Sequence, residues 1–468
     1  MNKYVNINRR RFLQRALMAT AGGATLAATQ GKLQLMKSAL AASTCSASDE
    51  KSLVCVFLLG GNDSFNMFMP YEQTAYDQYA DARGDLAVPR NEILSVNNGD
   101  SGFCQELAGV RDLYNEGSVA VVQNMGVLIQ PLTRAEYLDA VASRDLSKVP
   151  EGLFAHNHAQ KLWQTSAGTV AGSSTGWGGQ VAEALAGCNT SENPYSFSVA
   201  GNNIWQTGRT TLPMVLHPSR SIDLMEGYEA ELDNDDWSDS RATLMNQFLQ
   251  QAKTDNQFLA QQAGYTVERA KLSSKRLGNI LDNTPVINTT YDPDNKLAVQ
   301  LRRVAELVHA RNTLGLKRQI FFVAVGGWDT HTGQKSRHSG LLQMLNDGLY
   351  SFYRTLQELG LENTVTTFTA SDFGRTLTSN GNGTDHGWGG HNLVIGGSVK
   401  GGVYGTMPEF EIGGVDDGGN KGRIIPTISV NQYSATLARW IGVSETDIEN
   451  IFPDLTNFTK GNLEFFSI

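Results

Sequence analysis

Positive charge, long apolar runs and cysteine are all scarce in this chain of 468 residues. Its 38 lysine and arginine residues are outnumbered by 47 aspartate and glutamate residues, which gives a formal net charge of -9. This balance disfavours nucleic acids and anionic membranes as partners, because both are negatively charged. No segment contains the roughly twenty apolar residues that a membrane-spanning helix needs, so we expect no stable membrane anchor.

The four cysteines lack the spacing of a zinc finger. Cys55 lies within a predicted core strand, so we expect a buried thiol there. Cys104 and Cys188 are candidates for a disulfide in an oxidising compartment, and the sequence leaves this pairing open. Cys45 follows Ala-Ser-Thr, which is a poor context for a lipoprotein signal, so lipid anchoring is not expected.

The N-terminal segment predicts export. Residues 8–13 read Asn-Arg-Arg-Arg-Phe-Leu, a mildly apolar run follows at 16–29, and a small-x-small cleavage site lies at 39–41. This pattern is typical of a twin-arginine (Tat) signal peptide, here residues 1–41, which is removed from the mature protein. A basic amphipathic arm is the alternative. We therefore expect a periplasmic or secreted protein that meets the Tat translocase during export.

The rest of the chain, residues 50–468, is predicted to form a single α/β domain. Runs of apolar and β-branched residues at 52–59, 118–124, 319–325 and 364–370 predict buried strands. Helical spacing of apolar residues alternates with these strands, which is typical of a largely parallel sheet flanked by helices. A polar, helix-favouring stretch at about 226–295 predicts a helical insertion.

Three of the predicted strands lead into glycine-containing loops that carry possible metal ligands. The strand at 52–59 leads to Asp63 and Asn66, the strand at 319–325 leads to Asp329 and His331, and the strand at 364–370 leads to Asp372. The carboxyl ends of parallel strands share one edge of a sheet, where α/β proteins place their sites. A strand-end Asp can also be a helix cap or turn residue. The convergence favours a site for one or two divalent ions, with zinc, manganese and calcium as candidates.

Further candidate ligands follow in a glycine-rich loop. The loop after Asp372 delivers Asp385, His386 and His391, and the two histidines compete for one ligand position. Upstream, His156 is a candidate catalytic residue, although a lone histidine is more often structural.

Thr133 and two arginines are candidates for handling an anion. Thr133 followed by Glu136 predicts a capping box with Thr133 as the N-cap of a helix. Because a helix N-terminus favours anions, Thr133 is a candidate nucleophile, and a plain cap is the alternative. Arg134 and Arg375 are candidates to clamp an anionic group bidentately, and structural ion pairs are the alternative for both.

Several short motifs occur together in one order: Gly-Gly-Asn-Asp at 60–63, Thr-Gly-Trp-Gly-Gly at 175–179, Trp-Asp-Thr-His at 328–331, Ser-Asp-Phe-Gly-Arg-Thr at 371–376, Asp-His at 385–386 and Gly-Gly-Ser-Val-Lys-Gly-Gly at 396–402. They resemble the bacterial family named domain of unknown function fifteen-oh-one, from about residue 53 to the C-terminus. That family is grouped with the alkaline phosphatase and sulfatase superfamily. The resemblance implies an alkaline-phosphatase-like α/β sandwich with a di-metal centre, Asp63 as a ligand and a hydroxyl nucleophile at or near Thr133.

The leading hypothesis is an exported, metal-dependent hydrolase of phosphate or sulfate esters, acting on an anionic small molecule or polymer. The alternative is a non-catalytic periplasmic binding or assembly protein on the same fold. A glycosidase with paired carboxylates has no distinguishing motif here. The sequence leaves the substrate and the oligomeric state open.

Overall fold

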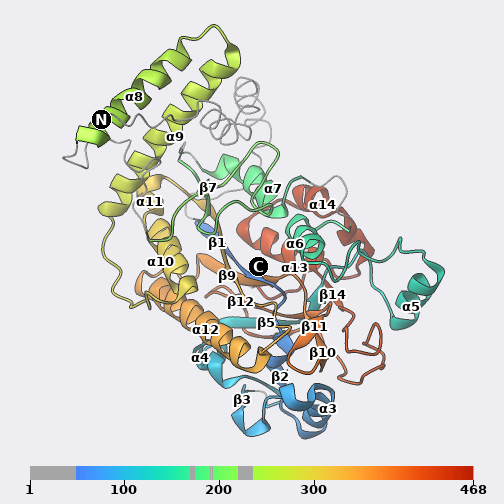
Figure 1. Ribbon diagram of the computed structural model, residues 1–468. Helices are drawn as coiled ribbons and strands as arrows, with labels where there is room; N and C mark the ends of the chain where they lie inside the picture. Colours follow the sequence, from blue (N-terminus) through green and yellow to red (C-terminus); the bar gives the residue numbers. More distant parts are fainter. Residues whose placement is uncertain are drawn as a thin grey trace, which may run out of the picture. The chain divides into compact units, whose positions relative to one another are not determined.

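The computed structural model describes residues 49–97, 99–168, 174–189, 191, 193–219 and 236–466 (Figure 1). The signal peptide predicted at 1–41 lies outside these residues. Two compact units are distinguished. One contains the helices α8 (Asp236–Lys253) and α9 (Phe258–Asp282), which pack on each other and lie in the range of the predicted helical insertion. The other unit contains the central sheet and the remaining elements.

The central sheet accounts for the fold class. Its strands within the described residues run in the order β13 (Gly402–Tyr404), β5 (Val119–Gly126), β12 (Gly390–Ile395), β9 (Val365–Ser371), β1 (Lys51–Leu59), β8 (Arg318–Gly326), β6 (Ser196–Ser198) and β7 (Met214–Val215), with β14 (Ile428–Ser429) paired to β5. All neighbouring pairs are parallel except those of β12, which is antiparallel to both β5 and β9. The predicted α/β class with a largely parallel sheet is confirmed.

Strands β9, β1 and β8 are adjacent and end together. Leu58 lies opposite Ser371 of β9, and Leu59 lies opposite Gly326 of β8. This register brings the residues that follow the three strands to one edge of the sheet. The sequence predicted this convergence from the apolar runs and the glycines behind them.

Helices cover both faces of the sheet. Alternate residues of a strand point to opposite faces, and Leu53, Cys55 and Phe57 pack in one apolar cluster with α6, α7 and α13. Helix α10 packs on β8 and on α12. Figure 1 shows α10 and α12 on one side of the strands and α6, α7 and α13 on the other. The bounds of these helices are α6 (His156–Thr165), α7 (Trp177–Ala184), α10 (Lys296–His309), α12 (Gln334–Glu358) and α13 (Val430–Ile441).

The segment after β9 differs from the prediction. The sequence predicted a glycine-rich loop carrying Asp385, His386 and His391. Instead, β10 (Arg375–Ser379) and β11 (Thr384–His386) form an antiparallel hairpin, and His391 lies inside β12 of the central sheet. The glycines sit where the backbone is crowded: a Cβ at Gly383 would lie 2.2 Å from the carbonyl oxygen of Thr330. The many glycines therefore reflect close packing of chain segments as well as turns.

The remaining elements are short. A second small sheet has the order β2 (Phe68–Pro70), β4 (Ser101–Phe103) and β3 (Leu94–Ser95). The other α-helices are α3 (Gln73–Arg83), α4 (Ala108–Asn115), α5 (Arg134–Ser143), α11 (Arg311–Leu314) and α14 (Glu445–Ile451). Single 3-10 turns lie at Ser64–Asn66, Gly84–Leu86, Arg90–Glu92, Gln105–Leu107, Ala186–Cys188 and Pro453–Asn457.

Two further observations concern the cysteines and the apolarity of the helices. Cys55 and Cys104 are free, buried thiols, as predicted for Cys55. Cys188 is disulfide-bonded, so its partner is not Cys104. Among the described residues, no helix has the length and apolarity needed to cross a membrane.

Candidate metal centre

The loops that leave β1 and β8 meet tightly at the sheet edge. Gly60 follows β1 with a φ of +122°, and a Cβ there would lie 2.4 Å from the backbone nitrogen of Asp329. Only glycine combines this backbone conformation with this close approach. The contact sets Asp329, three residues beyond β8, against the end of β1. The glycine after the first strand is therefore part of how the candidate centre is built.

Three side chains converge at this edge. His156 at the start of α6, Asp329 after β8 and His386 at the end of β11 each offer a ligand atom, and these atoms all lie within 4.8 Å of one another. The Nε2 atoms of His156 and His386 each lie 3.3 Å from an oxygen of Asp329. All three residues are partly exposed. The cluster combines two imidazoles and one carboxylate, a donor set typical of zinc and related transition metals.

Both imidazoles are oriented by their other nitrogen. His386 Nδ1 lies 2.6 Å from the carbonyl oxygen of Phe154, which can only accept, so Nδ1 carries the proton. His156 Nδ1 lies 2.8 Å from Asp372 Oδ2 and donates to this buried carboxylate in the same way. In each ring, the nitrogen that faces the cluster is then Nε2. His156 Nε2 is buried and has no hydrogen-bond partner among the described residues, as expected of a nitrogen free to bind a metal.

Asp372 is the buried hydrogen-bond partner of His156. Its carboxylate also accepts hydrogen bonds from Gln160 Nε2 (2.8 Å) and from the backbone nitrogen of Gly60 (3.2 Å). Burial raises the pKa of Asp372, and the hydrogen bonds from Gln160 and His156 oppose that rise. A carboxylate behind a histidine is the usual partner of a metal-binding imidazole. For His386, burial disfavours the charged ring and therefore lowers the pKa, so the neutral ring is favoured.

His331 and Asp385 lie next to the cluster. His331 Nε2 lies 2.9 Å from His386 Nε2 and 3.1 Å from Asp329 Oδ1. Its Nδ1 lies 3.6 Å from Oδ1 of Asp385. The other carboxylate oxygen of Asp385, Oδ2, pairs with the exposed Lys421 at 3.3 Å. The two residues thus adjoin the three-residue cluster, and we call them its rim.

Arg375 holds Asp329 from the buried side. Its Nη1 donates to Asp329 Oδ1 at 2.7 Å and to the carbonyl oxygen of Gly60 at 3.4 Å, and its Nε donates to Thr384 Oγ1 at 3.1 Å. Burial alone would raise the pKa of Asp329, but the hydrogen bond and charge of Arg375 bring it below the ordinary value. The guanidinium is fully buried, and all three of its nitrogens bind protein groups. Arg375 thus favours the ionised form of Asp329.

Asp63 and Asn66 belong to a separate buried network. Asp63 is fully buried and forms an ion pair with Arg83, and it also accepts from Gln334. Asn66 accepts from Tyr79 Oη (2.7 Å) and Arg83 Nε (3.1 Å) and donates to the carbonyl oxygen of Leu86 (2.7 Å). Asp63 is therefore paired with an arginine, whereas the resemblance implied that it binds a metal.

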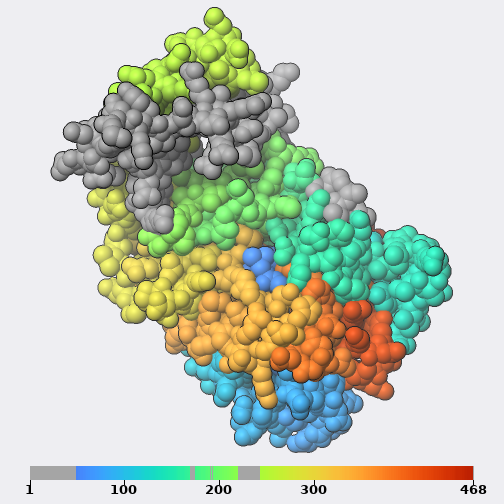
Figure 2. All heavy atoms as spheres, in the orientation of Figure 1, coloured from blue at the N-terminus to red at the C-terminus, as the bar shows by residue number. Residues whose placement is uncertain are grey.

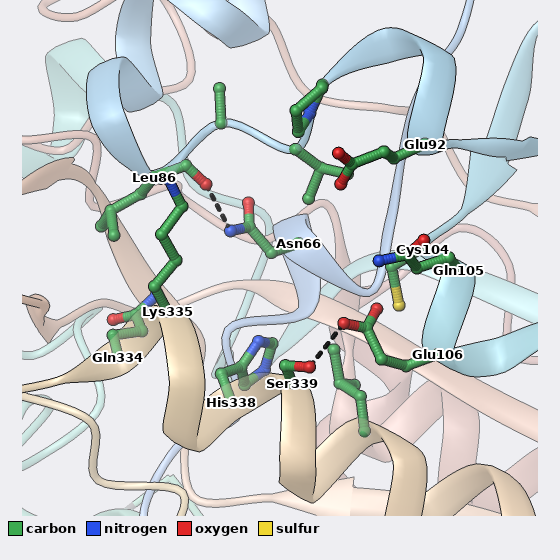
Figure 3. Close-up of a pocket in the computed structure, with 14 residues that line it drawn as sticks. Asn66, Leu86, Glu92, Cys104, Gln105, Glu106, Gln334, Lys335, His338 and Ser339 are labelled. Atoms are coloured by element: carbon green, nitrogen blue, oxygen red, sulfur yellow. Dashed lines mark hydrogen bonds between the residues drawn. The ribbon is translucent and has the colours of Figure 1, made fainter.

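This network borders a cavity of about 110 Å³, shown in Figure 3. Asn66 and His338 line it, and Ser339 Oγ donates to Glu106 Oε1 at 2.6 Å. None of His156, Asp329 and His386 lines this cavity. His338 Nε2 lies 2.9 Å from Asn62 Oδ1, and burial lowers the pKa of His338 to about 4.

Neither His391 nor Thr133 belongs to the cluster. His391 is buried against Phe65 and Phe68, and its Nδ1 accepts from the backbone nitrogen of Asn124 at 3.1 Å. Thr133 forms the predicted capping box, in which its Oγ1 donates to Glu136 Oε2 at 2.7 Å. Both side chains are thus engaged in these contacts, and of the two histidines it is His386 that lies in the cluster.

Arg134 is also engaged within the protein. Its Nε donates to the carbonyl oxygen of Asp417 at 2.9 Å, and its Nη2 donates to that of Gly419 at 3.4 Å. Sequence reasoning did not select Gln160 or the Phe154 carbonyl as supports of the cluster. The spacing of His156 and Gln160, four residues apart on one helix face, was a usable signal for Gln160. No sequence signal identifies a backbone carbonyl.

Residues 50–432 match the family described as "Protein of unknown function (DUF1501)". No curated protein sequence matches. One similar structure is "Ps i-CgsB in complex with k-i-k-neocarrahexaose", with 10% identity, a TM-score of 0.36 and coverage of 88% of this chain and 77% of that chain. Another is "the lipoteichoic acid synthase LtaP from Listeria monocytogenes", with 7% identity, a TM-score of 0.34 and coverage of 90% and 81%.

Proposed function

The chain belongs to the DUF1501 family, and we propose that it is a metal-dependent hydrolase of phosphate or sulfate esters. In this proposal His156, Asp329 and His386 bind the metal, with His331 and Asp385 at the rim. One observation carries the proposal: three donor atoms lie within 4.8 Å of one another, and both imidazoles are held with Nε2 facing the cluster.

The spacing of the donors fits a transition metal. Two ligand atoms that each lie about 2.0–2.1 Å from a zinc ion, at a tetrahedral angle, are about 3.3 Å apart. His156 Nε2 lies 3.3 Å from Oδ2 of Asp329, and His386 Nε2 lies 3.3 Å from Oδ1, so each histidine matches this spacing with a different oxygen of the carboxylate. Calcium binds oxygen ligands at longer distances and takes six to eight of them, so two imidazoles favour zinc or manganese over calcium.

The proposed chemistry divides between the metal and the chain. A bound divalent ion would polarise the ester oxygen and lower the pKa of a coordinated water. Asp372 and the Phe154 carbonyl fix the rings of His156 and His386, and Arg375 keeps Asp329 ionised. Water, not Thr133, is the proposed nucleophile, because the Thr133 hydroxyl is bonded to Glu136.

A second candidate function is a non-catalytic periplasmic binding or assembly protein with a structural metal. Three observations favour it: Thr133 caps a helix, Asp63 is paired with Arg83, and both Arg134 and Arg375 bind protein groups. Export through the Tat translocase to the periplasm, which belongs to both candidates, is proposed from residues 1–41 alone.

Hydrolysis assays distinguish the two candidates. The full chain is stripped of metal with a chelator, reloaded with zinc or manganese, and assayed with p-nitrophenyl phosphate and p-nitrophenyl sulfate. The hydrolase proposal expects activity that returns with metal and is lost in Asp329→Asn. His158→Ala, a change on the same helix as His156 but outside the cluster, is the matched control and keeps activity. Metal binding without hydrolysis of either ester would support the binding protein instead.

A further inference from the structure

The loop that precedes β14 is organised around one buried carboxylate. Asp417 is fully buried, and its Oδ1 accepts from the backbone nitrogens of Gly419 (2.9 Å) and Arg423 (3.0 Å). Its Oδ2 accepts from those of Gly413 (3.0 Å) and Gly422 (2.9 Å). Four hydrogen bonds to one ionised group fix the path of the loop, because charge-assisted bonds are stronger than neutral ones.

The same loop is attached to α5. Arg134 donates to the carbonyl oxygens of Asp417 and Gly419. Figure 2 shows the orange-red chain near residue 415 beside the teal segment that contains α5. The loop thus has two anchors, the internal carboxylate and the start of α5, and Arg423 lies at its end.

Arg423 rests against the residues that position His386. Its Nε donates to the carbonyl oxygen of His386 at 3.1 Å, and its guanidinium carbon lies 4.3 Å from the centroid of the Phe154 ring. The carbonyl oxygen of Phe154 in turn binds His386 Nδ1. Arg423 is therefore attached directly to one of the proposed metal ligands and stacked on its neighbour.

The guanidinium of Arg423 has two terminal nitrogens, Nη1 and Nη2. Among the described residues, neither Nη1 nor Nη2 has a hydrogen-bond or ion-pair partner, and the side chain is partly exposed. An arginine has five N–H donors, so four remain available. Arg375 is fully buried with every nitrogen bonded, and Arg134 holds the loop, so Arg423 differs from both arginines chosen from the sequence.

We propose that Arg423 binds a tetrahedral oxyanion, such as the phosphate or sulfate group of a substrate, at the edge of the metal centre. The inference rests on the proposed function, because it assigns substrate recognition to the same site. Arginine presents a planar fork that matches such an anion bidentately. The stack on Phe154 and the bond to His386 hold that fork before the anion arrives, which reduces the entropy lost on binding.

The chain supplies a matched control. Arg90 also donates Nε to a backbone carbonyl, that of Tyr71 at 2.9 Å, and its guanidinium carbon lies 4.4 Å from the Tyr71 ring centroid. It sits in the 3-10 turn Arg90–Glu92, outside the proposed centre. Arg90→Gln therefore removes the same local contacts and the same charge without touching the proposed anion site.

Calorimetric titrations with inorganic phosphate and with sulfate test the inference. The full chain and its variants Arg423→Gln, Arg423→Lys and Arg90→Gln are compared in the zinc-loaded and the metal-free state, after zinc content has been measured. We expect Arg423→Gln to weaken binding of the preferred anion by about 10- to 100-fold, with an intermediate loss for Arg423→Lys. Arg90→Gln should bind as the unmodified chain does, and zinc content should not change. The two titrants show which anion is preferred.

The outcomes separate this inference from the proposed function. If Arg423→Gln binds both anions as tightly as the unmodified chain, or if the unmodified chain binds neither at millimolar concentration, the inference is wrong even where zinc is bound. If the protein binds no metal but its anion binding depends on Arg423, the metal-dependent hydrolase falls and the anion site stands.

Discussion

Replacing His391 with asparagine should remove a specific part of the pH dependence of stability. The ring is 2% exposed, its Nδ1 accepts from the backbone nitrogen of Asn124, and its Nε2 has no hydrogen-bond partner among the described residues. Burial lowers the pKa of His391 to about 3. In His391→Asn, the amide oxygen offers an acceptor close to the position of Nδ1 and does not titrate.

The magnitude follows from linkage. The pKa of His391 in the folded state lies below the unfolded value of about 6.5. Above pH 6.5 the His391 ring is therefore neutral in both folded and unfolded chains, and its titration does not reduce the free energy of unfolding. Below that pH the unfolded chain takes up a proton that folded His391 does not, so stability falls until the pH approaches 3. At pH 5 about one unfolded chain in thirty keeps this ring neutral, which corresponds to a loss of about 2 kcal/mol.

Urea unfolding at pH 7 and at pH 5 measures the effect. The free energy of unfolding of the unmodified chain should fall by about 2 kcal/mol more than that of His391→Asn over this interval. The variant also loses ring packing against Phe65 and Phe68, but that loss is the same at both pH values. His338, which burial also keeps neutral, titrates in both proteins and cancels. Equal pH dependence in the two proteins would refute the argument.

Three further predictions concern other parts of the unit that contains the sheet. Gly60→Ala should lower the free energy of unfolding by about 1–3 kcal/mol and reduce zinc content, because its Cβ would strike the backbone of Asp329; thermal unfolding and elemental analysis check this. Asp372→Asn should weaken zinc binding about 10- to 100-fold in a chelator competition, since it removes the carboxylate behind His156, and unchanged affinity would exclude that role. Cys104 should resist a thiol reagent until the chain unfolds, because burial raises its pKa; rapid labelling of the folded chain would contradict this.

Local sequence patterns were sufficient for the core of the fold. Strands β1, β8 and β9 were predicted from their runs of apolar and β-branched residues, and the structure places them side by side with their ends together. The helix cap at Thr133 was predicted from the four-residue capping box, which depends on neighbours in sequence. Such features are decided locally, so a single sequence carries them.

The grouping of the candidate ligands depended on contacts distant in sequence. His156 and Asp372 are separated by 216 positions, and only the fold brings them together. The ion pair of Asp63 with Arg83 follows from the docking of α3 beside β10, which no motif encodes. His391 was separated from His386 because the chain after β9 returns as a hairpin and then as a strand of the central sheet. The candidate residues were thus available from sequence, but their roles depend on tertiary packing.

Metal content is the most direct test of the proposed centre. The full chain, His156→Ala, His386→Ala and the control His158→Ala are purified, exposed to equimolar zinc, passed through a desalting column and measured by elemental analysis. The proposal predicts about one zinc per chain in the unmodified protein and in His158→Ala, and strong loss in both cluster variants. Folded protein without zinc, or zinc retained equally in all four proteins, would contradict a metal centre at His156, Asp329 and His386.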